Sequence, residues 1–182
     1  MQLVYFFGGV YSLNKNIGKS YNQYIEMLPN DNSWACFFDG DACFLTPNYG
    51  HQITHIVNKY PETGMFTCIT NRVGNLNQCF RGQISADADI KTHRRLAHQI
   101  QLDSYEKVKE SKSPISGIMM CIKKSTWRNF PFAGSGILQV DNDISRRLIK
   151  AGKKILIMEG VYLFHYYRLL EGGRSFKQHL KK

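Results

Sequence analysis

The stretch Trp34-Ala35-Cys36-Phe37-Phe38-Asp39-Gly40-Asp41 decides how the rest of the chain is interpreted. Its first five residues form a continuous apolar run, which is typical of a buried strand, parallel to its neighbours, in an α/β sheet. Ligands of open α/β sheets bind beyond the carboxyl ends of the strands, and Asp39 and Asp41 stand at that position. Gly40 allows the backbone to turn tightly between them, so both carboxylates can face one hard divalent cation.

The chain contains three Asp-x-Asp triplets, at 39–41, 87–89 and 141–143. Chance alone gives roughly 0.35 such triplets for eight aspartates in 182 residues, so the pattern by itself is a weak signal. The triplet at 87–89 lies in a polar stretch and predicts a helix start, where acidic residues favour the helix dipole. Only the triplet at 39–41 follows a buried strand, which makes it the candidate metal site.

Strands and helices are expected to alternate on both sides of this stretch. Apolar runs predict strands at 1–7, 34–38, 65–70, 115–122, 154–158 and 161–166. Helical spacing of apolar residues predicts helices at 17–28, 49–58 and 141–151, and a polar surface helix within 86–109. The alternation predicts an α/β fold, a single sheet flanked by helices. We expect one domain over residues 1–168 and a basic tail or lid at 169–182.

The composition is that of a folded protein. The 182 residues are 43% hydrophobic and 21% charged, and no apolar stretch is long enough to span a bilayer. The first seven residues lack the basic start and the cleavage site of a signal peptide. Five cysteines without a CxxC pair favour free thiols and a reducing, cytoplasmic compartment.

The formal net charge of +10 comes mainly from basic residues in the second half of the chain. One interpretation is nucleic-acid binding by phosphate neutralisation. A second is attraction of a nucleotide-sugar diphosphate or of an anionic membrane surface, and a third is a solvated basic face. Aromatic residues lie in core-like runs rather than between arginines on exposed strands, which argues against nucleic-acid binding.

Four segments resemble, in the expected order, motifs of the GT-A-fold glycosyltransferases of family 2. Residues 16–22 resemble the N-x-G start of the first helix beside the nucleotide, and residues 37–41 resemble the DxD motif. Residues 117–120 are similar to the glycine-containing strand beside the donor sugar. Residues 141–148 are similar to the E-D-x-D-[LI]-x-x-R-L segment.

The sequence departs from the family pattern in two ways. Family members usually have another strand–helix unit before the DxD motif, so this chain resembles a minimal GT-A domain. Val140 stands where the family often has Glu, which leaves Asp141 as the residue carried over as catalytic base. An inverting transfer needs such a carboxylate to accept the proton of the acceptor hydroxyl. Asp143 as the base, and Asp141 as the N-cap of the following helix, are kept as alternatives.

The resemblance also implies a metal-dependent reaction. Asp39, Asp41 and His165 would hold Mn²⁺ or Mg²⁺, although a histidine in an apolar run is more often a satisfied core residue. A larger set of residues near the four motifs is expected to bind the nucleotide-sugar donor: Tyr11, Gly18, Asn22, Asp39, Gly40, Asp41, Gly117 and Arg168. Of these, Tyr11 is expected beside the nucleobase, and Arg168 is expected to close over the diphosphate.

The resemblance thus implies an inverting glycosyltransferase of the hexosyltransferase type. It would move a sugar from a UDP-sugar to a hydroxyl of a glycan, a lipid-linked acceptor or a protein. A basic nucleic-acid-binding module is one alternative. A nucleotidyltransferase, with a similar α/β plan and acidic pair, is the other, but Gly8-Gly9 is not followed by a glycine-rich basic phosphate loop.

Overall fold

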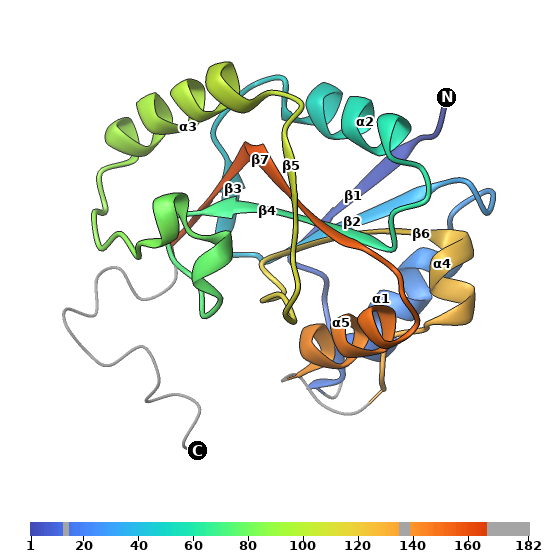
Figure 1. The fold of residues 1–182 in the computed structure, drawn as a ribbon. Coiled ribbons are helices and arrows are strands. Elements are labelled where there is room, and N and C mark those ends of the chain that lie inside the picture. The colour runs from blue at the N-terminus through green and yellow to red at the C-terminus, as the bar shows by residue number, and fades with distance from the viewer. Residues whose placement is uncertain (13–14, 135–138, 167–182) are drawn as a thin grey trace.

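A seven-stranded mixed sheet forms the centre of the described chain, which comprises residues 1–12, 15–134 and 139–166 of the computed structural model. Its strands are β1 (Val4–Gly8), β2 (Trp34–Phe38), β3 (Ala42–Phe44), β4 (Met65–Thr70), β5 (Val108–Glu110), β6 (Met119–Lys123) and β7 (Ile155–His165). The helices are α1 (Ile17–Glu26), α2 (Tyr49–Lys59), α3 (Ile90–Ser104), α4 (Lys124–Asn129) and α5 (Val140–Lys150), with short 3-10 turns η2 (Leu76–Gln78) and η3 (Phe80–Gly82). This arrangement confirms the expected α/β class (Figure 1).

The strands are arranged in the order β1-β2-β6-β4-β7-β3, and β5 also pairs with β7. β1 and β2 are parallel and are joined by α1, which confirms the predicted strand–helix–strand unit. β4 and β7 are parallel as well. In contrast, β6 runs antiparallel to both β2 and β4, whereas the apolar run of β2 predicts parallel neighbours.

The path of residues 111–118 explains the reversed direction of β6. After β5 the chain returns to the carboxyl edge of the sheet, the edge at which β1, β2 and β4 end. There Gly117 N–H donates to Asp141 Oδ2 at 2.7 Å. β6 therefore begins opposite the end of β2, with Met119 paired to Phe38, and runs back across the sheet.

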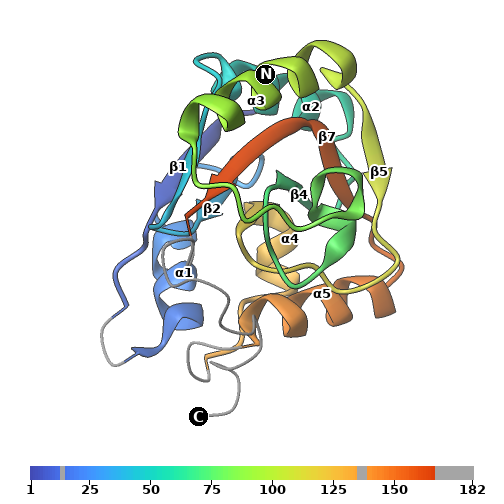
Figure 2. The same cartoon turned by 90° about the vertical axis from the view of Figure 1, so that its left-hand side faces the viewer.

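Helices cover both faces of the sheet. Figures 1 and 2 show α2 and α3 on one face and α1, α4 and α5 on the other. Tyr21 and Ile25 of α1 are buried there with Ile144 and Leu148 of α5, at the helical spacing that the sequence predicts. These apolar contacts place the first turns of α1 and α5 beside the carboxyl edge.

Two predicted helix ends are confirmed by their caps. Asp89 accepts the N–H of Lys91 at the start of α3. Gly152 follows α5 with a φ of 71°, the left-handed conformation that glycine adopts most readily. Both ends match the sequence pattern because capping depends on residues close together in the chain.

β7 is one bent strand, although the sequence predicts two. Residues 159–161 have no partner on β4, because the ladder jumps from Met158 to Tyr162. Any Cβ on Gly160 would lie 2.2 Å from the carbonyl oxygen of Ser104, so only glycine fits the bend against α3. The bend turns the last residues of β7 toward β3.

Short elements and strand starts are the parts of the fold that differ from expectation. β3, α4 and β5 are not predicted, and the strand expected at 115–122 begins only at Met119.

All five cysteines are free, four of them buried in apolar surroundings: Cys36, Cys68, Cys79 and Cys121. Within residues 1–12, 15–134 and 139–166, no helix combines the length and the apolar character needed to cross a membrane.

Candidate functional site

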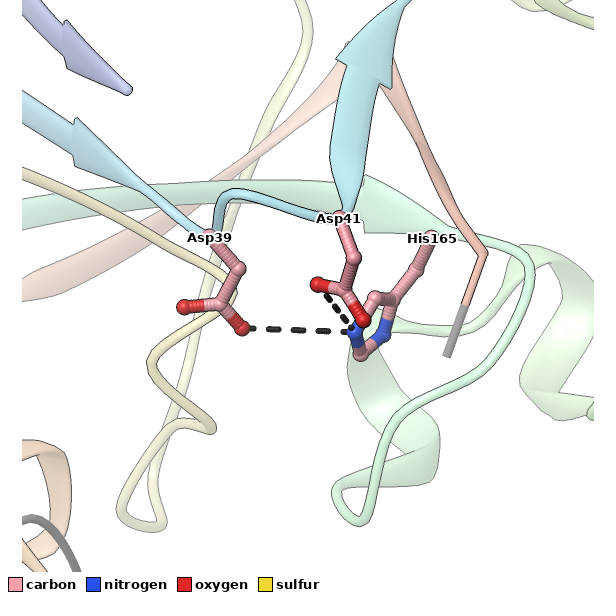
Figure 3. Close-up of side chains that lie close together, drawn as sticks. All are labelled: Asp39, Asp41 and His165. Carbon is pink, nitrogen blue, oxygen red and sulfur yellow. Dashed lines mark ion pairs between the residues drawn. The ribbon is translucent and has the colours of Figure 1, made fainter. Parts of the chain in front are cut away.

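The connection from β2 to β3 carries the predicted metal-binding pair at the carboxyl edge (Figure 3). Asp39 N–H donates to the Ile118 carbonyl at 3.2 Å, which ties the end of β2 to the start of β6. Gly40 lies so close to Gly9 that an added Cβ would be 3.2 Å from the Gly9 Cα. The loops after β1 and β2 therefore pack against each other, and this contact fixes the backbone between Asp39 and Asp41.

His165, the last residue of β7, adds a third ligand atom to this pair. It pairs with Ala42 of β3, and Tyr166 N–H donates to the Asp41 carbonyl oxygen at 2.9 Å. Its Nε2 lies 3.4 Å from Asp41 Oδ1 and 4.0 Å from Asp39 Oδ2 (Figure 3). One ligand atom from each of the three side chains lies within 4.8 Å of the other two.

A backbone hydrogen bond holds the imidazole of His165 in one tautomer. Nδ1 lies 2.9 Å from the Arg72 carbonyl oxygen, which can only accept, so Nδ1 carries the proton. Burial lowers the pKa of His165, against opposing contributions from the Arg72 carbonyl and Asp41. The neutral ring therefore directs the lone pair of Nε2 toward the two carboxylates.

The carboxyl of Asp39 is crowded by negative charge. Burial, followed by the charges of Asp41 and Asp141, raises the pKa of Asp39 to about 7. About 40% of its side-chain surface is nevertheless exposed, so a ligand can reach it. Two carboxylates and an imidazole suit Mn²⁺, and the carboxylate oxygens also suit Mg²⁺. The residues present therefore fit a divalent metal ion, whose charge would offset this crowding.

Asp141 lies in the first turn of α5, near the same carboxyl edge of the sheet. Its Oδ2 accepts the N–H of Gly117 at 2.7 Å, and its Oδ1 accepts the N–H of Asn142 at 2.8 Å. A Cβ on Gly117 would lie 3.0 Å from the Asp141 Cβ, so glycine permits this approach. The charge of Asp141 also helps to raise the pKa of Asp39, which places the two carboxylates in one electrostatic environment.

Of the two alternatives for the start of α5, the structure tests the N-cap, and Asp143 as the base stays a prediction. The helix is capped by Gln139, with a φ of 72°, so the alternative of Asp141 as its N-cap is wrong. Asp143 forms a salt bridge with Arg147, one turn further along α5, with Oδ2 2.7 Å from Nη2. The Asp143 carboxylate is therefore engaged within the helix, while Asp141 faces Gly117.

Gly18 and Asn22 of α1 lie against the loop 130–134. A Cβ on Gly18 would lie 1.9 Å from the Ala133 carbonyl oxygen. Asn22 Nδ2 donates to the Phe132 carbonyl at 2.9 Å, and its Oδ1 accepts the Phe132 N–H at 2.9 Å. These contacts give both residues a part in holding the loop, and their predicted contact with the donor stays a prediction.

The remaining predicted donor-binding residues lie near the ends of the described chain. Tyr11, in the loop after β1, is 75% exposed. Its neighbour Ser12 has a buried hydroxyl oxygen without a hydrogen-bond partner in the part of the chain that the structure describes. Arg168 and the predicted tail at 169–182 lie outside the described residues.

Sequence patterns point only weakly to three residues beside the site. Asn71 and Arg72 follow β4 and resemble loop residues in the sequence, yet both form hydrogen bonds to His165. Tyr21 is part of the predicted apolar face of α1, and burial, Asp39 and Asp141 raise its phenol pKa. For Asn71 and Arg72, the position directly after a strand is the signal that the sequence carries.

Comparison with known proteins adds no family assignment. No protein-family model matches the chain, and no curated protein matches it significantly.

Proposed function

We propose that this chain is a metal-dependent GT-A-type glycosyltransferase that moves a sugar from a nucleotide-sugar, with UDP as the expected nucleotide, to an acceptor hydroxyl. The observation that carries the proposal is the convergence of Asp39, Asp41 and His165 at one sheet edge, with Asp141 close enough for its charge to raise the pKa of Asp39. A metal-binding group and a separate carboxylate are the two components that an inverting transfer of this kind needs. The mixed sheet with its first strand–helix–strand unit leading into the acidic pair is compatible with this class.

The donor side of the reaction depends on the metal ligands. Asp39, Asp41 and His165 would hold Mn²⁺ or Mg²⁺, which when bound neutralises charge on the donor diphosphate. The fixed tautomer of His165 keeps Nε2 available as a ligand atom.

The acceptor side depends on Asp141. Its carboxylate takes the proton of the acceptor hydroxyl while the hydroxyl oxygen forms a bond to the anomeric carbon. The bond from that carbon to the diphosphate oxygen breaks, and its electron pair leaves with the nucleoside diphosphate. Gly117 and Asn142 occupy one lone pair on each Asp141 oxygen, so other lone pairs stay available to the hydroxyl.

The proposal is tested by calorimetric titration of the purified chain with UDP, GDP and CDP, each with and without Mn²⁺. We expect UDP to bind only when Mn²⁺ is present. Asp41→Asn should weaken that binding roughly tenfold or more, because it removes a charged ligand. The matched control Asp103→Asn, an exposed residue near the end of α3, should bind UDP as the wild type does.

Two outcomes would overturn the proposal. One is that none of the three nucleotides binds in a Mn²⁺-dependent way. The other is that the chain instead binds single-stranded or double-stranded nucleic acid tightly and in a salt-sensitive way, as the alternative based on the basic surface predicts.

A further inference from the structure

Asn71 connects the end of β4 to the end of β7. It follows the last residue of β4 at the carboxyl edge and is only 2% exposed. Its Oδ1 accepts the N–H of His165 at 2.7 Å, and its Nδ2 donates to the carbonyl oxygen of His165 at 3.0 Å. Thr70 Oγ1 lies 3.2 Å from the same Oδ1 and can donate to it. The carboxamide thus binds both main-chain polar groups of one residue.

The side chain of Asn71 supplies the hydrogen bonds that β4 would give to His165 if the strand continued. The ladder between β4 and β7 stops at the pair Thr70–Leu163, two residues before His165. Without a partner on this side, the buried N–H and C=O of His165 would be left unsatisfied at a cost comparable to a lost hydrogen bond. The Asn71 carboxamide supplies one acceptor and one donor in their place.

The next residue holds the ring of His165. The Arg72 carbonyl oxygen accepts the proton on Nδ1 at 2.9 Å. Asn71 therefore fixes the main chain of His165 and Arg72 fixes the side chain. The two neighbouring residues together aim Nε2 at Asp39 and Asp41.

We infer that Asn71 is a positioning residue for the metal ligand His165: it sets the position of the His165 main chain, and through it the orientation and tautomer of the imidazole. This inference rests on the proposed metal-dependent function. Groups that orient metal-bound histidines commonly contribute to metal affinity although they do not touch the ion.

Another asparagine provides a matched control for the loss of these two side-chain hydrogen bonds to one main-chain residue. Asn58, in the last turn of α2, binds the main chain of Gln2 in the same way: its Oδ1 accepts the Gln2 N–H at 2.9 Å, and its Nδ2 donates to the Gln2 carbonyl at 3.5 Å. Gln2 precedes β1, at the opposite edge of the sheet from Asp39. Asn58→Ala therefore removes comparable hydrogen bonds far from the candidate metal site.

The experiment measures Mn²⁺ binding to the chain without nucleotide, from the loss of the free Mn²⁺ signal in electron paramagnetic resonance. Asn71→Ala should weaken Mn²⁺ binding by roughly 10- to 100-fold. Asn58→Ala should lower the thermal stability but leave the Mn²⁺ affinity unchanged. Asn71→Leu serves as a second variant of similar size and no charge: it can neither accept from the His165 N–H nor donate to the carbonyl, and it should weaken Mn²⁺ binding as well.

A double-mutant cycle separates positioning from a general structural effect. If Asn71 acts through His165, Asn71→Ala should weaken Mn²⁺ binding no further in a His165→Ala background. In the metal-free wild type, long-range ¹⁵N–¹H spectra should show His165 protonated on Nδ1, and Asn71→Ala should show a mixture of both tautomers.

The outcomes distinguish this inference from the proposed function. A wild-type chain that binds no Mn²⁺ would overturn the proposed metal site, and the role of Asn71 with it. Wild-type binding together with unchanged affinity in both Asn71 variants would overturn the positioning role alone. Additive losses in the double mutant would also overturn it, because Asn71 would then act independently of His165.

Discussion

The two sides of the candidate site are built in different ways. On the metal side, main-chain pairing of β3 with β7 and the contact between the loops after β1 and β2 fix the ligands. The other side of the site, here called the base side, contains Asp141 and the loop 130–134 that precedes α5. Side chains of two helices bind this loop. Asn22 of α1 binds Phe132, and Arg147 of α5 donates to the Pro131 carbonyl at 2.6 Å.

Because the two sides depend on different contacts, substitutions on the two sides should have different effects. On the metal side, Asp39 and Asp41 depend on strand pairing, which involves the whole sheet, whereas His165 also depends on the side chain of Asn71. On the base side, the position of Asp141 depends on the apolar packing of α5 and on side-chain hydrogen bonds to the loop 130–134. We therefore expect base-side substitutions to change the transfer rate while the metal affinity stays constant.

The largest expected effect is that of Asp141→Asn. The amide has nearly the shape of the carboxylate but cannot accept the proton of the acceptor, so the transfer rate should fall by roughly 10²- to 10⁴-fold. Binding of UDP with Mn²⁺ should be unchanged in calorimetry, because the metal ligands are intact. Asp143→Asn is the comparison variant: if it lost the activity and Asp141→Asn kept it, the base would be Asp143.

Asn22→Ala should have a smaller effect that tests the base side directly. It leaves the half-buried N–H of Phe132 without its partner, which should lower the free energy of unfolding by about 1–3 kcal/mol. Urea unfolding should show this loss, the rate of transfer should fall, and Mn²⁺ affinity should stay as in the wild type. Weaker UDP binding at unchanged stability would instead indicate that Asn22 contacts the donor.

The same comparison explains how much of the site the sequence predicts. Asp39 and Asp41 are recognisable because a buried strand and its carboxyl end are local features of the chain. His165 enters only through the family resemblance, since an apolar run gives no sign that its last residue meets β3. The role of Asn71 is invisible in the sequence, because it depends on contact between segments 94 residues apart.

The fold shows the same division between local and long-range features. Apolar periodicity predicts α1, α2, α5 and the strand–helix–strand unit. The reversed direction of β6 depends on the path of residues 111–118 along α5, and the bend of β7 depends on α3 packing against Gly160. Neither follows from a pattern within one segment, so both are absent from the sequence-based expectation.

The metal side should also respond to pH in the absence of metal. The pKa of Asp39 is raised from 3.8 to about 7, so between these values the folded state binds more protons than the unfolded state. Its contribution to stability is therefore present below about pH 4 and is lost as the pH rises toward 7. Thermal unfolding of the metal-free chain should show that Asp39→Asn removes this decline.

His165 also contributes to the pH dependence of stability, and its contribution must be distinguished from that of Asp39 in this experiment. Its pKa is lowered by burial, so it contributes stability above its ordinary value of 6.5 that is lost as the pH falls. The difference between the wild type and Asp39→Asn reports the carboxyl together with its interaction with His165 Nε2 at 4.0 Å, because His165 itself is present in both proteins. An identical pH dependence in the two proteins would contradict the raised pKa of Asp39.

The smallest expected effect concerns backbone strain at the start of α5. Gln139 has a φ of 72°, a conformation that costs a residue with a Cβ more than it costs glycine. Gln139→Gly should therefore raise the free energy of unfolding by up to about 1 kcal/mol, while Mn²⁺ affinity stays constant. Gly152→Ala tests the opposite change at the other end of the helix: an added Cβ meets nothing within 4 Å, yet the φ of 71° should make it destabilising by about 1 kcal/mol. If Gln139→Gly raised stability but slowed transfer, the left-handed residue before Asp141 would help to hold the base in place, as strained residues beside catalytic groups often do.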